Sequence, residues 1–283
     1  MTASSPGETA YLSARDGMRI AYSVSGTGPL TVFVHATGFC KEVCEPVIAE
    51  TRNLGVELSA LAFDQRAHGD SGVPVPPFDW WDLGGDIVEL VGESAPAIGV
   101  GHSSGGAAVV MAELLRPGTF AALVLVEPII LPPPYERRPD NTMAHQALRR
   151  KRGFTSRRAA LENFKTKRTF AHWEERALHA YVDGGFRQEG NRVVLKCTPE
   201  SEAEFFWAAT THGAWERLGE VTVPTFLLAG EHSTTHQEPF LSELTGRFGD
   251  GRSEIVPGTS HFVWMQRPAV VAEHVAAAVR RLG

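Results

Sequence analysis

Short apolar runs alternate along this chain with longer segments of mixed polarity, and turn-forming residues separate the two. Continuous apolar runs of this length are typical of parallel strands buried on both faces of a sheet. Alternation with helical segments predicts an α/β fold, with a mostly parallel sheet covered by helices on both faces. The predicted strands are Leu30 to Val34, Leu58 to Phe63, Ala97 to Val100, Ala121 to Val126 and Thr225 to Ala229.

Helices are expected over Lys41 to Asn53, Ala107 to Leu115 and Pro268 to Leu282, and another begins with Asp79-Trp80-Trp81-Asp82. Asp79 is a suitable N-cap for that helix because its side chain can accept a free backbone N–H. Near the start of the chain, Tyr11 to Ala14 and Met18 to Val24 flank Asp16-Gly17, which is a hairpin signal. The sheet is therefore expected to open with antiparallel strands.

The alternation stops between Leu131 and about Trp215, where the pattern predicts helices and polar loops. We therefore predict a core made of residues 1–131 and 216–283, and a helical cap over residues 132–215. The cap segment holds 15 Lys or Arg against 10 Asp or Glu, a formal +5, and the remainder holds 12 against 23, or −11. A basic lid would attract an anionic substrate. The simpler interpretation is a solvated surface, with Arg149 to Arg152 and Arg157-Arg158 on exposed faces.

Aromatic residues are frequent in the same segment. Some are expected to form the core of the cap, and others to line an apolar pocket. The sequence does not divide the two groups, which together comprise Phe154, Phe164, Phe170, Trp173, Tyr181, Phe186 and the run Phe205-Phe206-Trp207.

Composition narrows the class of protein. A chain of 283 residues with 43% hydrophobic content can bury a large core. A net charge of −6 gives no reason to expect a nucleic-acid partner. Met1 to Glu8 lacks the basic and apolar start of a signal peptide, and no run approaches a membrane span, so we expect a cytoplasmic protein without a membrane partner. The three cysteines have no metal-site spacing and are expected to be small hydrophobes, and neither a metal nor a cofactor is predicted.

The stretch Gly101-His102-Ser103-Ser104-Gly105-Gly106 joins a predicted strand to a predicted helix. A Gly-x-Ser-x-Gly pattern in this setting is typical of a nucleophile elbow, a tight turn that exposes a reactive serine. The alternative is a glycine-rich turn whose serines only cap the helix.

With this pattern the chain resembles the α/β-hydrolase superfamily, in its serine-nucleophile branch with a cap. Three other segments carry the resemblance, in the family's order. His35-Ala36-Thr37-Gly38 is similar to the family's His-Gly-x segment, Asp64 to Ser71 to its Asp-x-Arg-Gly-x-Gly-x-Ser turn, and Ile255 to Phe262 to the strand and loop that deliver a catalytic histidine.

The resemblance implies roles for individual residues. Ser103 would be the nucleophile and His261 the base that takes its proton. The backbone N–H groups of Ser104 and Thr37 would form the oxyanion hole. Ala36 stands where the family usually has glycine. The serine also indicates attack on a carbonyl, since family members that attack an alkyl carbon use aspartate at the elbow.

The third member of the triad departs from the family's pattern. A Gly-x-x-Asp segment usually supplies the acid, but here Gly230 is followed at that spacing by Ser233. Glu127 closes an earlier apolar strand, where certain haloalkane dehalogenases and lactone hydrolases carry their acid, and we predict that it is the acid. Glu231 is the alternative, and a chain without a working acid is the third possibility. His232 and His236 are kept as candidate pocket residues.

These features predict a serine hydrolase that cleaves a carboxylic ester or lactone through an acyl-enzyme. Carbon–carbon bond hydrolysis, thioester hydrolysis and cofactor-free perhydrolysis use similar triads and remain alternatives. A non-catalytic ligand-binding relative is an alternative of another class. The expected partner is a small molecule of hydrophobic or anionic character, and pairing of the closing helices into a homodimer stays open.

Overall fold

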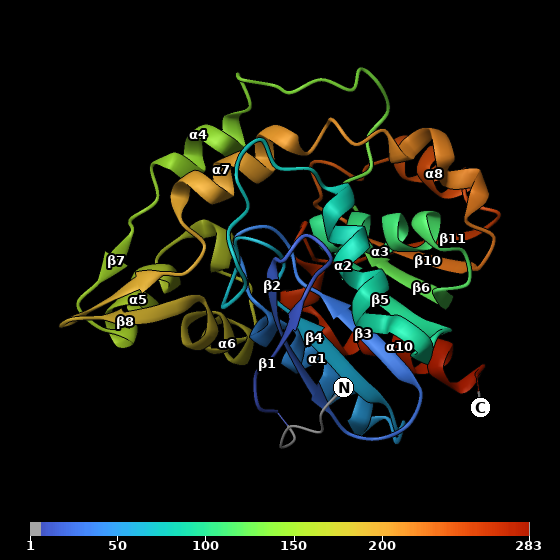
Figure 1. The fold of residues 1–283 in the computed structure, drawn as a ribbon, viewed down its shortest axis with the longest axis horizontal. Helices are drawn as coiled ribbons and strands as arrows, with labels where there is room; N and C mark the ends of the chain where they lie inside the picture. Colours follow the sequence, from blue (N-terminus) through green and yellow to red (C-terminus); the bar gives the residue numbers. More distant parts are fainter. Residues whose placement is uncertain (1–6, 283) are drawn as a thin grey trace.

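The computed structural model describes residues 7–282. Most of Met1 to Glu8, the segment in which no signal peptide was expected, lies outside the described residues. An eight-stranded sheet forms the centre, in the order β1-β2-β4-β3-β5-β6-β10-β11 (Figure 1). β1 (Ala10–Ser13) and β2 (Arg19–Ser25) form the expected antiparallel hairpin, and β2 pairs antiparallel with β4 (Ser59–Phe63). The other strands continue in parallel: β3 (Leu30–Val34), β5 (Ala97–His102), β6 (Phe120–Val126), β10 (Pro224–Gly230) and β11 (Asp250–Val256).

Helices cover both faces of this sheet, which confirms the predicted fold class. Successive side chains of a strand point to opposite faces, so Val32 and Val34 belong to one apolar cluster and Phe33 to the other. The first cluster includes residues of α2 (Trp81–Val91), α3 (Ser104–Leu115) and α8 (Phe240–Gly246). The second includes residues of η1 (Lys41–Cys44), α1 (Glu45–Asn53), α9 (Val263–Gln266) and α10 (Pro268–Arg280).

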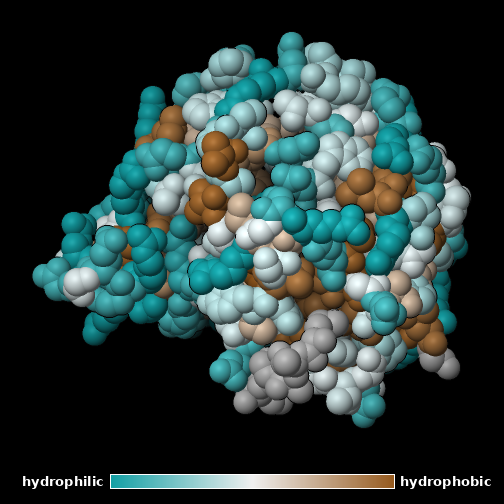
Figure 2. Space-filling model, viewed as in Figure 1, coloured by the Kyte–Doolittle hydropathy of each residue, from teal (hydrophilic) through white to brown (hydrophobic). Residues whose placement is uncertain are grey.

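The segment between β6 and β10 forms a separate lobe beside the sheet, drawn from green to gold in Figure 1. The lobe is largely hydrophilic on the face shown in Figure 2. Its helices are α4 (Thr142–Leu148), α5 (Arg157–Lys165), η3 (Arg168–Phe170), α6 (Glu175–Gly185) and α7 (Pro199–Ala208). The segment η4 (Ala214–Glu220) crosses the predicted boundary at residue 216.

The expectation of a purely helical cap is wrong in one respect. A three-stranded antiparallel sheet, in the order β7-β9-β8, lies within the segment, built from β7 (Gly153–Phe154), β8 (Phe186–Glu189) and β9 (Arg192–Leu195). Gly190-Asn191 forms a two-residue turn between Glu189 and Arg192, and Gly190 has a φ of 59°. A Gly-Asn turn before β-branched residues is a hairpin signal, and it overrides the helical tendency of its surroundings.

An ion-pair network, buried at Arg66 and Asp86, ties the N-terminal hairpin to the sheet and to α2. Arg66, which follows β4, donates two hydrogen bonds of 2.7 Å to the carboxylate of Asp86 in α2. The guanidinium also pairs with Asp16 in the β1–β2 turn. The three cysteines are free and fully buried, and no helix in residues 7–282 is long and apolar enough to cross a membrane.

Candidate active site

Ser103 occupies a strained turn between β5 and α3. Its φ of 56° and ψ of −115° lie outside the regions that residues with a side chain prefer. The backbone passes so closely here that a Cβ on Gly101 would lie 2.4 Å from Gly105 O, and one on Gly105 would lie 2.3 Å from Val34 O. Only glycine fits these two positions, as an elbow requires. Ser103 N–H donates to Val126 O at 2.9 Å, which holds the turn against the end of β6.

Two backbone N–H groups next to Ser103 are available to a ligand. Ser104 is the first residue of α3, so its N–H has no acceptor within the helix. In the loop after β3, Gly38 N–H donates to His68 Nε2 at 2.8 Å and Phe39 N–H to Ala36 O at 3.2 Å. Among the described residues Thr37 N–H has no acceptor.

His68 fixes the conformation of that loop, a role that the sequence did not reveal. Burial lowers the pKa of His68 to about 3, so its ring is neutral at physiological pH. Nε2 accepts from Gly38, so the ring proton lies on Nδ1 and is donated to Arg66 O at 2.9 Å. The sequence feature that points to this role is the position of His68 within the Asp64 to Ser71 turn, which the structure places against the loop after β3.

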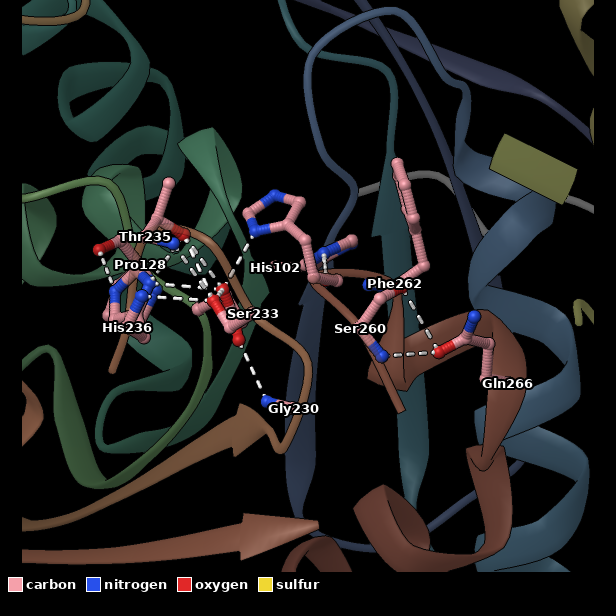
Figure 3. A network of polar contacts seen from close by, with 11 residues as sticks. His102, Pro128, Gly230, Ser233, Thr235, His236, Ser260, Phe262 and Gln266 are labelled. Atoms are coloured by element: carbon pink, nitrogen blue, oxygen red, sulfur yellow. Dashed lines mark hydrogen bonds and ion pairs between the residues drawn. The ribbon is translucent and has the colours of Figure 1, made fainter. Parts of the chain in front are cut away.

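Glu127 directly follows β6, has a φ of 48° and is fully buried. Its Oε1 accepts a hydrogen bond of 2.8 Å from Gly230 N–H. Its Oε2 accepts from the hydroxyl groups of Ser233 at 2.7 Å and Thr235 at 3.0 Å. Figure 3 shows Ser233, Thr235 and His236 gathered in this network. The serine at the family's usual acid position therefore binds a carboxylate that comes from another strand.

Two histidines share Oε2 of Glu127: His261 Nδ1 lies 2.9 Å away and His236 Nδ1 lies 3.0 Å away. Burial of this carboxylate favours its neutral form, but hydrogen bonds and charge from His236 and His261 outweigh burial. The pKa of Glu127 is therefore held well below its ordinary value. Glu127 is a carboxylate over the whole physiological range. With Nδ1 of His261 turned to this carboxylate, Nε2 is the nitrogen left for Ser103.

His102, a residue of the elbow, forms a hydrogen bond with the backbone of the His261 loop. Burial lowers the pKa of His102 to about 3, and its Nε2 lies 2.9 Å from His261 O, so the neutral ring donates there. The His102 ring stacks on Trp264 with 6.0 Å between centroids. Ser260 N–H donates to Gln266 Oε1 at 2.8 Å, as Figure 3 shows. The His102 side chain therefore supports the loop that carries His261.

The alternative acid lies elsewhere. The Glu231 side chain is 53% exposed, and its Oε2 accepts from Gly258 N–H at 2.9 Å. No hydrogen bond or ion pair joins Glu231 to His261 among residues 7–282. His232 is also exposed and His236 is buried behind Glu127, so neither lines the cavity described next.

Ser103 and His261 line one cavity of about 520 Å³, between the core and the lobe. This volume suits a small organic ligand. Thr37, Gly38 and Phe262 line it from the core. The structure also assigns places to the aromatic residues. Phe154, Phe164, Phe170 and Phe206 line the cavity, and the first two of them also belong to one of the apolar clusters. Tyr181, Phe186 and Phe205 are fully buried in the two apolar clusters, which also include Trp173.

Glu127, His236 and His261 are also the one group in the described residues with donor atoms placed as a metal site needs, all within 4.8 Å of one another. Both histidines direct Nδ1 at the same carboxylate oxygen rather than at a common vacant point. The arrangement is that of one carboxylate with two histidines within hydrogen-bond distance of it.

The comparisons with known proteins concern the family and the fold of the chain. The family model described as "Alpha/beta hydrolase family" matches residues 31–274. A 2-(acetamidomethylene)succinate hydrolase of Mesorhizobium japonicum is 26% identical, over 88% of this chain and 87% of its own length. The peroxisomal membrane protein LPX1 of Saccharomyces cerevisiae is 23% identical, over 86% of this chain and 73% of its own length.

Solved structures match over almost the whole chain. A crystal structure of E-2-(acetamidomethylene)succinate hydrolase superposes with a TM-score of 0.80 at 19% identity, covering 96% of this chain and 99% of the other. The structure of Lpx1 from Saccharomyces cerevisiae gives a TM-score of 0.79 at 21% identity, covering 99% and 86%. At these identities the matches establish the fold.

Proposed function

The chain belongs to the alpha/beta hydrolase family, and from this premise we propose that it is a serine hydrolase that cleaves a carboxylic ester or lactone. Ser103 is the nucleophile, His261 the base and Glu127 the acid, and the N–H groups of Ser104 and Thr37 form the oxyanion hole. The observation that carries the proposal is the 2.9 Å contact between His261 Nδ1 and Glu127, at a cavity that Ser103 and His261 share.

The reaction begins when the Ser103 hydroxyl attacks the substrate carbonyl and His261 Nε2 takes its proton. Glu127 keeps the imidazole in the tautomer with hydrogen on Nδ1 and stabilises the imidazolium. The carbonyl oxygen becomes an oxyanion that accepts from Ser104 and Thr37. When the intermediate collapses, His261 gives its proton to the departing alcohol oxygen, and the acyl group stays on Ser103.

Deacylation repeats these steps with water. A water oxygen attacks the acyl carbon while His261 takes a proton from that water. His261 then gives the proton to Ser103 Oγ as the acyl–serine bond breaks. The acid product leaves and the free serine is restored. In a lactone the alcohol and the acid belong to one molecule, so a hydroxy acid is released.

A fluorophosphonate probe tests the proposal directly. We expect the probe to label Ser103 and the Ser103→Ala variant to remain unlabelled, with turnover of p-nitrophenyl esters falling at least about a thousandfold. Ser242→Ala, which changes an exposed serine of α8, is the matched control and should label normally. Peptide mapping by mass spectrometry identifies the labelled residue.

The substrate panel decides among the related reactions. Esters and lactones are expected to turn over faster than matched thioesters and diketones. A preference for diketones would show that the enzyme cleaves a carbon–carbon bond, and a preference for thioesters that it cleaves a thioester bond, rather than the proposed ester or lactone bond. An unlabelled Ser103 without turnover of any substrate would contradict catalysis and indicate a ligand-binding protein.

A further inference from the structure

The cavity that Ser103 lines has an uneven distribution of charge. Four cationic side chains line it, all from the lobe: Arg149, Arg150, Lys151 and Lys167. Among residues 7–282, the one carboxylate in the lining is Glu202 of α7. The Arg149 to Arg152 run was predicted more simply as a solvated face, and that interpretation is incomplete because three of its members line the cavity.

One of the four cations already forms an ion pair within the protein. Arg150 pairs through Nη1 with Glu202 and donates from Nη2 to the Tyr181 hydroxyl. This pair lies against Gly38, where a Cβ would meet Glu202 Oε1 at 2.7 Å. Arg150 and Glu202 therefore neutralise each other close to the oxyanion loop.

The other three cations have no carboxylate partner among the described residues. Arg149 follows α4, Lys151 precedes β7 with its Nζ 4.4 Å from the centroid of the Phe154 ring, and Lys167 follows α5. All three are exposed, so they keep their hydration until a ligand arrives. A ligand anion at this position does not have to displace a protein carboxylate.

We propose that the substrate carries a carboxylate, which Arg149, Lys151 and Lys167 bind while the reacting carbonyl lies at Ser103. This inference rests on the proposed function and specifies its substrate class. Phe154, Phe164, Phe170 and Phe206 would pack against the apolar chain between the two polar ends. The substrate is then an ester or lactone with a short apolar segment and a free acid at the far end.

The test compares two esters that differ in the terminal group. Mono-p-nitrophenyl adipate and p-nitrophenyl hexanoate have acyl chains of equal carbon number, and only the first carries a carboxylate. At low ionic strength we expect kcat/KM for the adipate ester, after subtraction of background hydrolysis, to exceed that of the hexanoate by about tenfold or more. The ratio should shrink as salt is added, because exposed charges are screened.

Matched variants separate local recognition from overall charge. The triple variant Arg149→Gln/Lys151→Gln/Lys167→Gln should bring the ratio close to one. Arg138→Gln/Arg168→Gln/Arg192→Gln removes the same charge from exposed positions of the lobe that do not line the cavity, and should keep the ratio. Equal kcat/KM values for the two esters in the wild type would overturn the proposal. An equal loss of the ratio in both triple variants would also overturn it.

A binding measurement makes the inference independent of turnover. In Ser103→Ala, calorimetric titration should give tighter binding of monoethyl adipate than of ethyl hexanoate, and the cavity-lining triple substitution should abolish the difference. Failure of the fluorophosphonate test with a retained difference would contradict the hydrolase function only. Turnover of both esters with no difference in binding would contradict the carboxylate site only.

Discussion

Glu127 shows how one residue can hold a whole site together. Its carboxylate accepts from Gly230, Ser233, Thr235 and two histidines, although burial alone favours the neutral acid. The several donors outweigh burial, so the charge that orients His261 is retained. Among non-glycine residues of the described chain, only Ala67, Ser103 and Glu127 have positive φ. Strained backbone is concentrated in active sites, which agrees with the roles proposed for the last two.

Replacing this carboxylate tests its proposed role. Glu127→Gln should lower kcat by about 10³- to 10⁴-fold, because an amide neither fixes the tautomer of His261 nor stabilises its imidazolium. The rate of p-nitrophenyl ester hydrolysis measures the loss. Glu231→Gln is the matched control, since it neutralises the exposed alternative acid, and should keep nearly normal activity. A large loss in Glu231→Gln with normal turnover in Glu127→Gln would reverse the assignment.

Stability at low pH shows whether Glu127 is charged in the folded protein. Its pKa is lowered on folding from an unfolded value of about 4.3, so its stabilising contribution is present above that pH and is lost as the pH falls below it. Urea denaturation should therefore show the stability advantage of the wild type over Glu127→Gln shrinking between pH 6 and pH 3. A difference that stays constant with pH would contradict a charged Glu127.

At the scale of elements, the junction of β5 and α3 depends on contact between backbones. Alanine is a better helix former than glycine, so propensity alone favours alanine within α3. At Gly105, however, a Cβ would lie 2.3 Å from Val34 O and 2.6 Å from His35 O, both of them backbone atoms. The clash exceeds the gain in propensity because neither carbonyl can move without shifting β3 and its loop.

Gly105→Ala should therefore destabilise the protein by about 1–3 kcal/mol and reduce turnover, since the strand and helix must separate. Gly85→Ala in α2 is the matched control, because a Cβ added there would have no atom within 4 Å and the φ of Gly85 is not positive. That variant should be more stable by up to about 1 kcal/mol. Urea denaturation measures both changes, and a stabilised Gly105→Ala would show that the elbow tolerates a side chain.

At the scale of the whole molecule, buried charge connects segments that are distant in the sequence. Arg66 binds Asp86 through two hydrogen bonds across 20 residues and pairs with Asp16 across 50. Burial raises the pKa of Asp86 to about 6 despite these bonds from Arg66. The pair thus orients the N-terminal hairpin, the turn after β4 and α2 around one guanidinium.

Removing the guanidinium should leave a buried carboxylate without its partner. Arg66→Leu is expected to cost about 3–5 kcal/mol, and Arg66→Leu/Asp86→Leu should recover much of this loss. Without the guanidinium, which favours the charged form, the pKa of Asp86 should rise further. The variant then continues to lose stability as the pH rises above about 6, where the wild type no longer does, so the deficit should grow there. Arg158→Leu, at an exposed pair with Glu162, should cost no more than about 1 kcal/mol in the same urea titrations. Equal costs for Arg66→Leu and Arg158→Leu would refute the network.

The sequence by itself determined the strands, most helices and the strand–turn–helix setting of Ser103, because periodicity, glycines and turn residues are local properties. It also placed Glu127 ahead of Glu231 as the candidate acid, since Ser233 cannot carry the charge and the resemblance implies an acid at the end of this earlier strand. Tertiary structure alone decided that Ser233, Thr235 and His236 surround Glu127, which lies more than 100 residues away. It also decided which aromatic rings and cations face the cavity and that β7, β8 and β9 form a sheet. These features depend on how distant segments pack, and no local pattern encodes them.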